Sequence, residues 1–379
     1  MMPAKGSIAG WKDKALHTPG PLTTSRTVKL AMLRDLGSRD TEFIALVSFI
    51  RHSLLELGEV SGKGYEALIM QGSGTFGIES VLSSATPPDG HWLVVINGAY
   101  GHRIAAINRV LKIRSTPLEF AENERPRPDA VEAALRKDSS ISHVAMVHCE
   151  TTTGIFNPVQ EIGRVARQHG KRYFVDAMSS FGAVPLNLAE AGIDFMVSSA
   201  NKCIEGVPGF SFILVSREAL LECEGRARSV SLDLLAQWRG LEGSGQFRFT
   251  PPTHALAAFA QALRELQEEG GITGRANRYR ANHAALAAGM REMGFREYLR
   301  PEDQGYIINA FHYPTHRNFE FETFYRLLND KGYVIYPGKL TQAECFRIGN
   351  IGRLFQSDMH ALLAAIRETL TEMQIDRAA

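Results

Sequence analysis

Short apolar runs alternate with longer amphipathic segments through the middle of this chain, and this alternation is the strongest constraint on its fold. Each run is only a few residues long and rich in Val, Ile, Phe or Met, which is typical of buried strands. The segments between them place apolar residues at helical spacing, as in residues 158–169. This alternation predicts an α/β fold in which helices cover both faces of a mostly parallel sheet. The expected strands are 67–71, 92–97, 143–148, 172–176, 194–198 and 210–215.

The pattern changes near residue 255, which indicates a second domain. Two helical stretches, 255–269 and 277–293, are separated by Gly270-Gly271. Shorter strand-like runs and a final amphipathic helix follow. We expect a large domain over residues 18–265 and a smaller α+β domain over 266–379, with residues 1–17 packing against the small domain or a partner subunit. The later elements are predicted at 305–312, 332–336, 345–351 and 358–373.

Charge and cysteine content exclude several classes of protein. The chain has 42 Lys+Arg and 41 Asp+Glu, so it lacks the basic excess of nucleic-acid binders. It contains no apolar run of about 18 residues, so no membrane span is expected. Its 4 cysteines lie far apart with no C-x-x-C, which argues against a disulfide framework or a zinc site and predicts no metal. We expect a cytoplasmic protein.

A small-residue turn, Gly72-Ser73-Gly74-Thr75, directly follows the first predicted strand and precedes a helical segment at 76–85. This arrangement leaves backbone N–H groups free at a helix start, where the helix dipole also favours an anion. A phosphate would bind there, and Ser73 and Thr75 would add hydroxyl donors. The alternative is an ordinary glycine turn with threonine as the helix N-cap.

Two charged residues follow successive predicted strands. Asp176 ends the strand 172–176, and Lys202 comes just after the strand 194–198. Ligands of open α/β sheets bind outside these carboxyl ends. A lysine in such a crevice has a lowered pKa and can act as a nucleophile. Asp176 alone could instead be a helix N-cap, and most lysines are solvated surface residues.

Taken together, the turn, the aspartate and the lysine match the needs of pyridoxal 5′-phosphate. This cofactor requires a phosphate site, an anion that keeps its pyridine nitrogen protonated, and a lysine that bonds to its aldehyde. The joint pattern therefore favours a pyridoxal-phosphate enzyme over the separate explanations of each residue.

At these residues the chain resembles the class-V aminotransferases, a family with the fold of the type-I pyridoxal-phosphate enzymes. The resemblance covers nearly the whole chain. The Thr-Pro-Gly-Pro and lysine blocks are common to the class, whereas the Gly-Ser-Arg-Asp and Phe-Arg-Ile-Gly blocks resemble the branch that acts on 2-aminoethylphosphonate and pyruvate. The blocks are His17-Thr18-Pro19-Gly20-Pro21, Gly37-Ser38-Arg39-Asp40, Gln71–Thr75, Asn97–Gly101, His148–Gly154, Val175–Ser180, Ser199–Cys203 and Cys345–Asn350.

The resemblance implies a seven-stranded, mostly parallel sheet and a set of cofactor contacts. Lys202 would bond to the cofactor and move a proton during catalysis, and Asp176 would pair with the pyridinium nitrogen. Tyr100 would stack on the ring, unless it is a core or interface tyrosine. Thr153, or Thr151, would bond the phenolic oxygen. The remaining cofactor residues would be Ser73, Gly74, Thr75 and Asn201.

The resemblance also implies a homodimer and a substrate site. Thr250 would reach the phosphate of the partner's cofactor, although it could simply be a turn residue before Pro251-Pro252. Arg347 would bind the phosphonate and the carboxylate in turn, since a planar guanidinium suits both. Arg39 is a second candidate for the phosphonate, with a salt bridge as the alternative.

The implied reaction moves the amino group of 2-aminoethylphosphonate to pyruvate, giving phosphonoacetaldehyde and L-alanine. Sibling enzymes of the alanine–glyoxylate or serine–pyruvate type would share Lys202, Asp176 and Arg347. A pyridoxal-phosphate lyase for aminophosphonates would share the cofactor site without using pyruvate. A cysteine desulfurase is disfavoured because Cys345 falls in a predicted buried strand. A scaffold without activity would have no need of all three residues.

Overall fold

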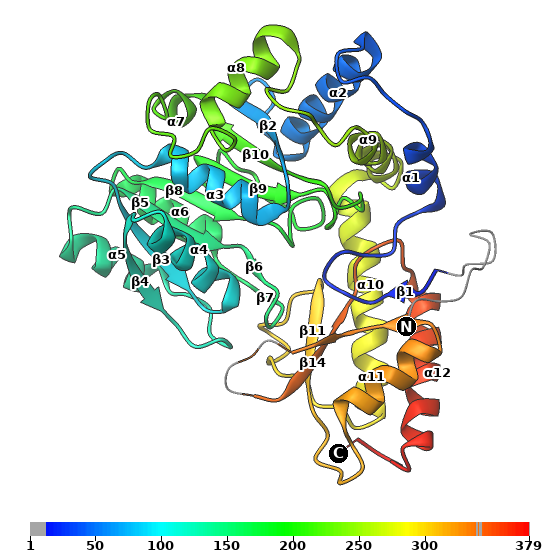
Figure 1. Cartoon of the computed structure of the whole chain (residues 1–379). Helices are drawn as coiled ribbons and strands as arrows, with labels where there is room; N and C mark the ends of the chain where they lie inside the picture. The colour runs from blue at the N-terminus through cyan, green and yellow to red at the C-terminus, as the bar shows by residue number, and fades with distance from the viewer. Residues whose placement is uncertain (1–12, 339, 341–342, 379) are drawn as a thin grey trace.

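A seven-stranded sheet occupies the centre of the larger part of the molecule (Figure 1). The computed structural model describes residues 13–338, 340 and 343–378. Strand β10 runs antiparallel to both its neighbours, and the remaining neighbours are parallel, which confirms the predicted mostly parallel seven-stranded sheet. In spatial order the strands are β2 (Tyr65–Gln71), β10 (Phe210–Ser216), β9 (Phe195–Ser199), β8 (Arg172–Asp176), β5 (His143–Val147), β3 (His91–Ile96) and β4 (Arg114–Glu119).

All six strands expected from apolar runs in this sheet form, each within two residues of the expected ends. The seventh, β4, was not expected. Among the residues that the structure describes it pairs with β3 alone, which makes it an edge strand, and its Arg-Ser-Thr-Pro-Leu-Glu sequence is half-exposed or exposed throughout. An edge strand that faces water has no need of a continuous apolar run and can carry a proline such as Pro117, so its sequence resembles a loop.

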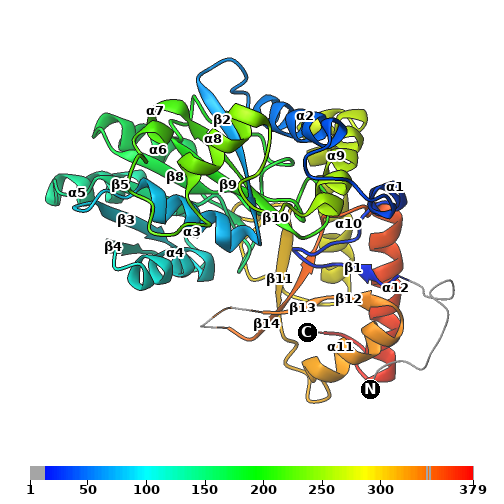
Figure 2. The same cartoon turned by 45° about the horizontal axis from the view of Figure 1, so that its top comes forward.

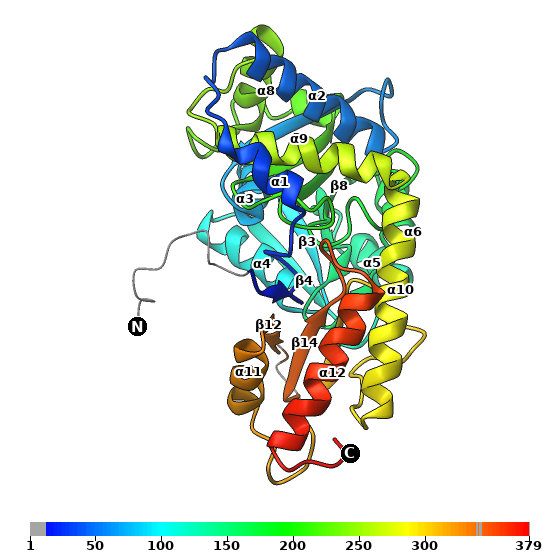
Figure 3. The same cartoon turned by 90° about the vertical axis from the view of Figure 1, so that its right-hand side faces the viewer.

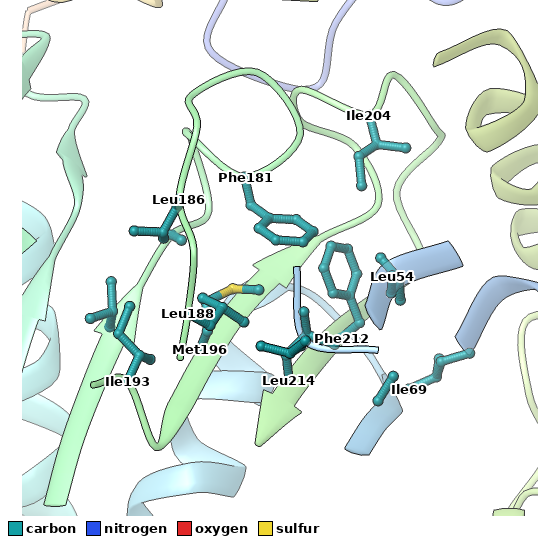
Figure 4. Packing of buried hydrophobic residues seen from close by; sticks show 14 of the residues in the cluster. Leu54, Ile69, Phe181, Leu186, Leu188, Ile193, Met196, Ile204, Phe212 and Leu214 are labelled. Atoms are coloured by element: carbon teal, nitrogen blue, oxygen red, sulfur yellow. The ribbon is translucent and has the colours of Figure 1, made fainter. Parts of the chain in front are cut away.

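Two hydrophobic clusters show that both faces of the sheet are covered by helices (Figure 2). Side chains alternate along the strands: in β10, Phe212 and Leu214 join the first cluster, and Ile213 and Val215 join the second. Figure 4 shows Phe212 and Leu214 packed with Met196 of β9 in the first cluster. That face is covered by α2 (Thr41–Leu57), α5 (Pro128–Lys137), α6 (Val159–Gln168) and α9 (Thr253–Glu268), and the other by α3 (Gly74–Ala85), α4 (Ala99–Val110), α7 (Arg217–Leu221) and α8 (Leu234–Ser244).

The C-terminal part has its own hydrophobic cluster and its own three-stranded antiparallel sheet. The long helix α10 (Gly271–Glu292) lies beside α12 (Gln356–Glu372), as Figure 3 shows. Helix α10 begins six residues before the expected start, because Gly270 is its N-cap and Gly271 is its first residue. The domain boundary near residue 265 stays a prediction. The sheet consists of β11 (Ile308–His312), β14 (Cys345–Gly349) and β13 (Tyr336–Pro337), and α11 (Phe321–Asp330) packs beside it.

The N-terminal segment crosses from the C-terminal part toward the edge of the large sheet. Strand β1 (Ala15–Leu16) pairs in parallel with β12 (Tyr333–Val334), and the His17 carbonyl accepts a hydrogen bond from the Gly349 amide at 2.9 Å. Of the segment expected to pack against the small domain or a partner, residues 1–12 lie outside the described residues. The short elements that complete the chain are α1 (Arg26–Leu30), a 3₁₀ turn at Ala31–Leu33, β6 (Cys149–Glu150) and β7 (Ile155–Phe156).

None of the helices in the described part of the chain is long and apolar enough to cross a bilayer.

Candidate active site

Asp176 is the last residue of β8 and lies where the neighbouring parallel strands β5 and β9 also end. It is 1% exposed, and both its oxygens accept hydrogen bonds. Oδ1 accepts from the Met178 amide at 3.0 Å, and Oδ2 accepts from Nη2 of Arg103 at 2.8 Å. The helix N-cap alternative is wrong, because residues 177–194 contain no helix. These two hydrogen bonds orient the buried carboxylate, which can pair with a cationic or N–H group at this edge of the sheet.

The Lys202 amine lies close to Asp176 and to the N-terminal segment. Its Nζ donates a hydrogen bond to the Pro19 carbonyl at 2.8 Å. A Cβ on Gly20 would come within 2.7 Å of the same Nζ, so the segment passes the lysine too closely for any side chain there. Desolvation is the largest cause that lowers the pKa of Lys202, and the Arg103 guanidinium lowers it further. A lowered pKa gives the amine more of its neutral, nucleophilic form.

The turn after β2 opens directly into α3, as the sequence predicts. Gly72 has φ +101°, a left-handed conformation that favours glycine, and a Cβ on Gly74 would lie 2.4 Å from the sulfur of Met178. The N-cap of α3 is Ser73, so the alternative in which Thr75 caps the helix is wrong. The Ser73 side chain makes no capping hydrogen bond, which leaves the first turn open to an anion.

Tyr100 lies in the first turn of α4 and is part-buried. The guanidinium of Arg103, one helical turn later, lies over its ring with 4.8 Å between the Arg103 Cζ and the ring centroid. Tyr100 also acts electrostatically on Lys202 and on Arg347, whose pKa it raises in both cases. The ring therefore lies among the groups that the sequence assigned to the cofactor and to the substrate.

The three threonines 151–153 are all buried in the turn between β6 and β7. Thr152 Oγ1 donates to the Glu150 carboxylate, and the Ala99 amide donates to that hydroxyl at 3.2 Å. Thr153 Oγ1 makes two long hydrogen bonds of 3.4 Å, donating to the Glu150 carbonyl and accepting from the Ile155 amide. The assignment of Thr153, or Thr151, to the cofactor stays a prediction.

Arg347 lies at the centre of β14 and is 1% exposed. Its Nε donates to the Pro337 carbonyl at 3.1 Å, and its Nη1 donates to the Thr151 carbonyl at 2.8 Å. Burial is the main cause that lowers its pKa, while Tyr100 and the Glu150 carboxylate raise it. The buried cation is thus oriented by backbone carbonyls and is electrostatically balanced by a carboxylate from the other part of the molecule.

Lys202, Asp176, Tyr100 and Arg347 form what is called the centre below. Of three further residues that the sequence assigned to the site, one lies beside this centre and two lie away from it. Asn201 precedes Lys202 and is part-buried, with its carbonyl oxygen 2.8 Å from a Cβ built on Gly20. Arg39 and Thr250 are both exposed and line a common cleft of about 360 Å³. The lining of that cleft includes none of Lys202, Asp176 and Arg347. Within one chain, the residues that the sequence singled out therefore form two separate groups, one around Lys202 and the other consisting of Arg39 and Thr250.

Sequence reasoning missed two residues of the centre, Arg103 and Glu150. Arg103 joins the predicted positions, since its Nη1 donates to Thr75 Oγ1 at 3.4 Å and its Nη2 to Asp176. Its Nε is buried without a hydrogen-bond partner among the described residues. The signal for Arg103 was its spacing of three residues from Tyr100, which places both on one helix face. Glu150 stood inside a quoted motif, but nothing in its spacing indicated its contacts.

Comparison with known proteins identifies one family and relatives that match nearly the whole chain. The Aminotransferase class-V family profile matches residues 31–348. The chain is 51% identical to a 2-aminoethylphosphonate–pyruvate transaminase of Syntrophobacter fumaroxidans over 94% of this chain and 96% of the relative. It is 50% identical to a protein of the same name from Klebsiella pneumoniae, over 94% and 97% of the two chains.

Solved structures of lower identity share the fold. A ureidoglycine–glyoxylate aminotransferase from Bacillus subtilis superposes with a TM-score of 0.89 at 24% identity, covering 96% of this chain and 94% of that one. An alanine–glyoxylate aminotransferase from Nostoc superposes with a TM-score of 0.88 at 23% identity, covering 97% of each chain. At these identities the likeness establishes the architecture alone.

Proposed function

This chain belongs to the class-V aminotransferase family, and from that premise we propose that it transfers the amino group of 2-aminoethylphosphonate to pyruvate. The products would be phosphonoacetaldehyde and L-alanine. The observation that carries the proposal is the identity of about half the residues, over nearly the full length of both chains, to transaminases named for that reaction. The grouping of Lys202, Asp176 and Arg347 supplies the chemistry that such a reaction needs.

The residues at the centre fit pyridoxal 5′-phosphate. A lysine amine of lowered pKa, a buried carboxylate and an uncapped helix start are the three groups that this cofactor requires. Ser73, Gly74 and Thr75 would hold the phosphate, Tyr100 would lie against the ring, and Asp176 would hold the pyridine nitrogen protonated. When bound, the cofactor supplies an electron sink for the carbon that carries the amino group.

Lys202 does the proton transfer in this proposal. Its desolvated amine is closer to the neutral form at working pH than an exposed lysine is, so it can bond to an aldehyde and later accept a proton from carbon. Arg103 keeps Asp176 oriented through a hydrogen bond of 2.8 Å, and its charge adds to the desolvation that lowers the pKa of Lys202. The acid–base role therefore depends on residues from β8, α4 and the loop after β9.

Arg347 would bind the anionic end of each substrate in turn. The two arginines at the centre, Arg103 and Arg347, face the carboxylates Asp176 and Glu150, and burial raises the pKa of Glu150 to about 7. Recognition of a small dianion therefore depends on a local arginine and not on the formal charge of +1 of the whole chain. A guanidinium can contact a phosphonate or a carboxylate through two parallel N–H groups, so one residue serves both half-reactions.

A panel of amine donors tests the proposal, with pyruvate as the acceptor and alanine formation as the measurement. We expect 2-aminoethylphosphonate to exceed alanine-like and ω-amino carboxylate donors by about 10²-fold or more in kcat/KM, since a site built to pair a dianion rejects ligands without one. Faster transfer from serine or alanine to glyoxylate would contradict the proposal in favour of a sibling activity. Consumption of many equivalents of the aminophosphonate per site without pyruvate would identify a lyase, because a transaminase consumes only one equivalent before it needs the acceptor.

We further propose that Arg39 and Thr250 serve the site of a second copy of the chain. Both are exposed, share one cleft, and lie in a lining that excludes the residues of their own centre. The Thr250 segment is tied to the end of β2 by a hydrogen bond of 2.9 Å from Gln71 Nε2 to the Phe249 carbonyl. Thr250 would donate to the partner's cofactor phosphate, and Arg39 would contribute to the partner's phosphonate site.

Mixed dimers test this arrangement. A Lys202→Ala chain and a Thr250→Glu chain should each be nearly inactive, the second because its carboxylate repels the partner's phosphate. Refolded together in equal amounts, they should recover about a quarter of the wild-type activity, since half of the dimers are mixed and each holds one intact site. Recovery is measured against each variant refolded alone. Absence of any recovery, with mixed dimers demonstrated by a tag, would show that Thr250 acts within its own chain.

A further inference from the structure

The carboxylate of Glu150 is fully buried and joins two segments that build the centre. Its Oε1 accepts hydrogen bonds from the amide of Thr152 at 3.2 Å and from the Thr152 hydroxyl. Its Oε2 accepts from the amide of Tyr100, at 3.2 Å, in the first turn of α4. One carboxylate therefore connects the start of a helix to a loop about 50 residues away in sequence.

The fit between these two segments is tight. A Cβ on Gly98 would lie 2.4 Å from both Cδ and Cγ of Glu150, so the residue before α4 cannot carry a side chain without displacing the carboxylate. The Thr152 hydroxyl completes the contact by accepting from the Ala99 amide at 3.2 Å. Two orphan N–H groups of the helix start are thus satisfied by the Glu150–Thr152 pair, with a negative charge where the helix dipole favours one.

Each segment carries a residue of the centre. The helix start carries Tyr100, which acts electrostatically on Lys202, and the loop carries the Thr151 carbonyl, which accepts from Nη1 of Arg347 at 2.8 Å. We propose that Glu150 is a positioning residue that holds Tyr100 and, through Thr151, Arg347 in fixed relation to Lys202. It acts through these residues and does not itself touch the substrate. The inference rests on the proposed function, because it assigns Tyr100 and Arg347 their roles.

The energetics of Glu150 agree with a role in function rather than in folding. Burial raises its pKa from 4.5 to about 7, against the lowering effect of the Thr152 hydrogen bonds and the Gly101 amide. The titratable groups that face it are Asp176, Cys149 and Arg347. Because the folded state binds this proton more tightly than the unfolded state, the contribution of Glu150 to stability falls as pH rises from 4.5 to 7. At neutral pH the charged carboxylate therefore costs folding free energy.

The experiment compares Glu150→Gln with the matched control Glu161→Gln, an exposed glutamate on α6. The amide offers one acceptor in place of two, so it cannot serve both Tyr100 and Thr152. We expect pyridoxal phosphate to bind the variant roughly tenfold more weakly or worse, and KM to rise for both substrates. Loss of folded protein alone would lower the measured kcat and leave KM unchanged.

A second readout uses the protein without cofactor. The melting temperature of wild type minus that of Glu150→Gln should fall as pH rises from 4.5 to 7, and Glu161→Gln is measured in parallel as the exposed control. If Glu150→Gln does not fold, Gly98→Ala replaces it, since its methyl group displaces the carboxylate without removing it. Wild-type cofactor affinity and wild-type KM values in a folded variant of either kind would overturn the proposal.

The two proposals fail in different ways. If the donor panel identifies a different amine, the loss of cofactor affinity and the pH-dependent melting difference still report on Glu150. If the protein binds no pyridoxal phosphate at all, the proposed function fails, and with it the role that this inference gives to Tyr100.

Discussion

Replacing Lys202 by alanine is expected to abolish transamination and the visible absorbance of lysine-bound cofactor. The loss in kcat should be about 10³-fold or more, because one residue supplies both the covalent attachment and the proton transfer. The structure supports this expectation through the lowered pKa of the amine and through its place beside Asp176, Tyr100 and Arg103. The measurements are the visible absorbance of the bound cofactor and single-turnover alanine formation, both at the same protein concentration.

Two controls separate chemistry from folding. Lys137→Ala, on the exposed side of α5, removes a lysine without touching the centre and should behave as wild type. Lys202→Met keeps most of the side-chain volume and loses only the amine, so it replaces the alanine variant if that variant does not fold. Far-ultraviolet circular dichroism should be unchanged in both. Turnover near the wild-type level in a folded Lys202 variant would contradict the assignment of this lysine.

Replacing Arg347 by alanine is expected to raise KM for 2-aminoethylphosphonate and for pyruvate together. A charged, hydrogen-bonded pair contributes about 1.5–3 kcal/mol, so kcat/KM for each substrate should fall by about 10- to 150-fold. The residue is buried and its guanidinium is oriented by the carbonyls of Pro337 and Thr151, so little freedom is lost when it binds an anion. Steady-state kinetics with each substrate varied in turn is the measurement.

Arg347→Lys tests the geometry of the contact rather than its charge. A lysine keeps the positive charge but offers no planar pair of N–H groups, so it should recover only part of the affinity. Arg326→Ala, on the exposed face of α11, is the matched control and should leave both KM values unchanged. An increase in KM for one substrate alone would show that the two anions do not share this arginine.

The sequence allowed the buried strands to be predicted because they lie in continuous apolar runs. Strand β8 was expected with its exact ends, since Arg172 and Asp176 bound an apolar core of three residues. Strand β4 was not expected, because an exposed edge strand is stabilised by one neighbour and needs no apolar run. The start of α10 was placed too late because glycine pairs usually mark turns, whereas here Gly270 is the N-cap of a helix and Gly271 is its first residue.

The candidate centre was only partly predictable for a different reason. Asp176 and Lys202 follow successive strands, so the parallel topology alone brings them to one edge. Glu150 and Arg103 owe their positions to contacts with residues about 50 and 73 positions away, which no local pattern encodes. Likewise, Arg39 and Thr250 are more than 200 residues apart in the chain, and nothing in the sequence around them indicated that they line the same cleft.

The segment that passes over Lys202 has a consequence for the order in which the protein matures. The carbonyl that accepts from the lysine amine belongs to Pro19, 183 residues earlier, and its segment is anchored by β12 and by the amide of Gly349. During synthesis those anchors emerge from the ribosome long after the large sheet has done so. Because these anchors lie at residues 333–334 and 349 of 379, we expect closure over the lysine to wait for the C-terminal part of the chain and to be a late event of folding.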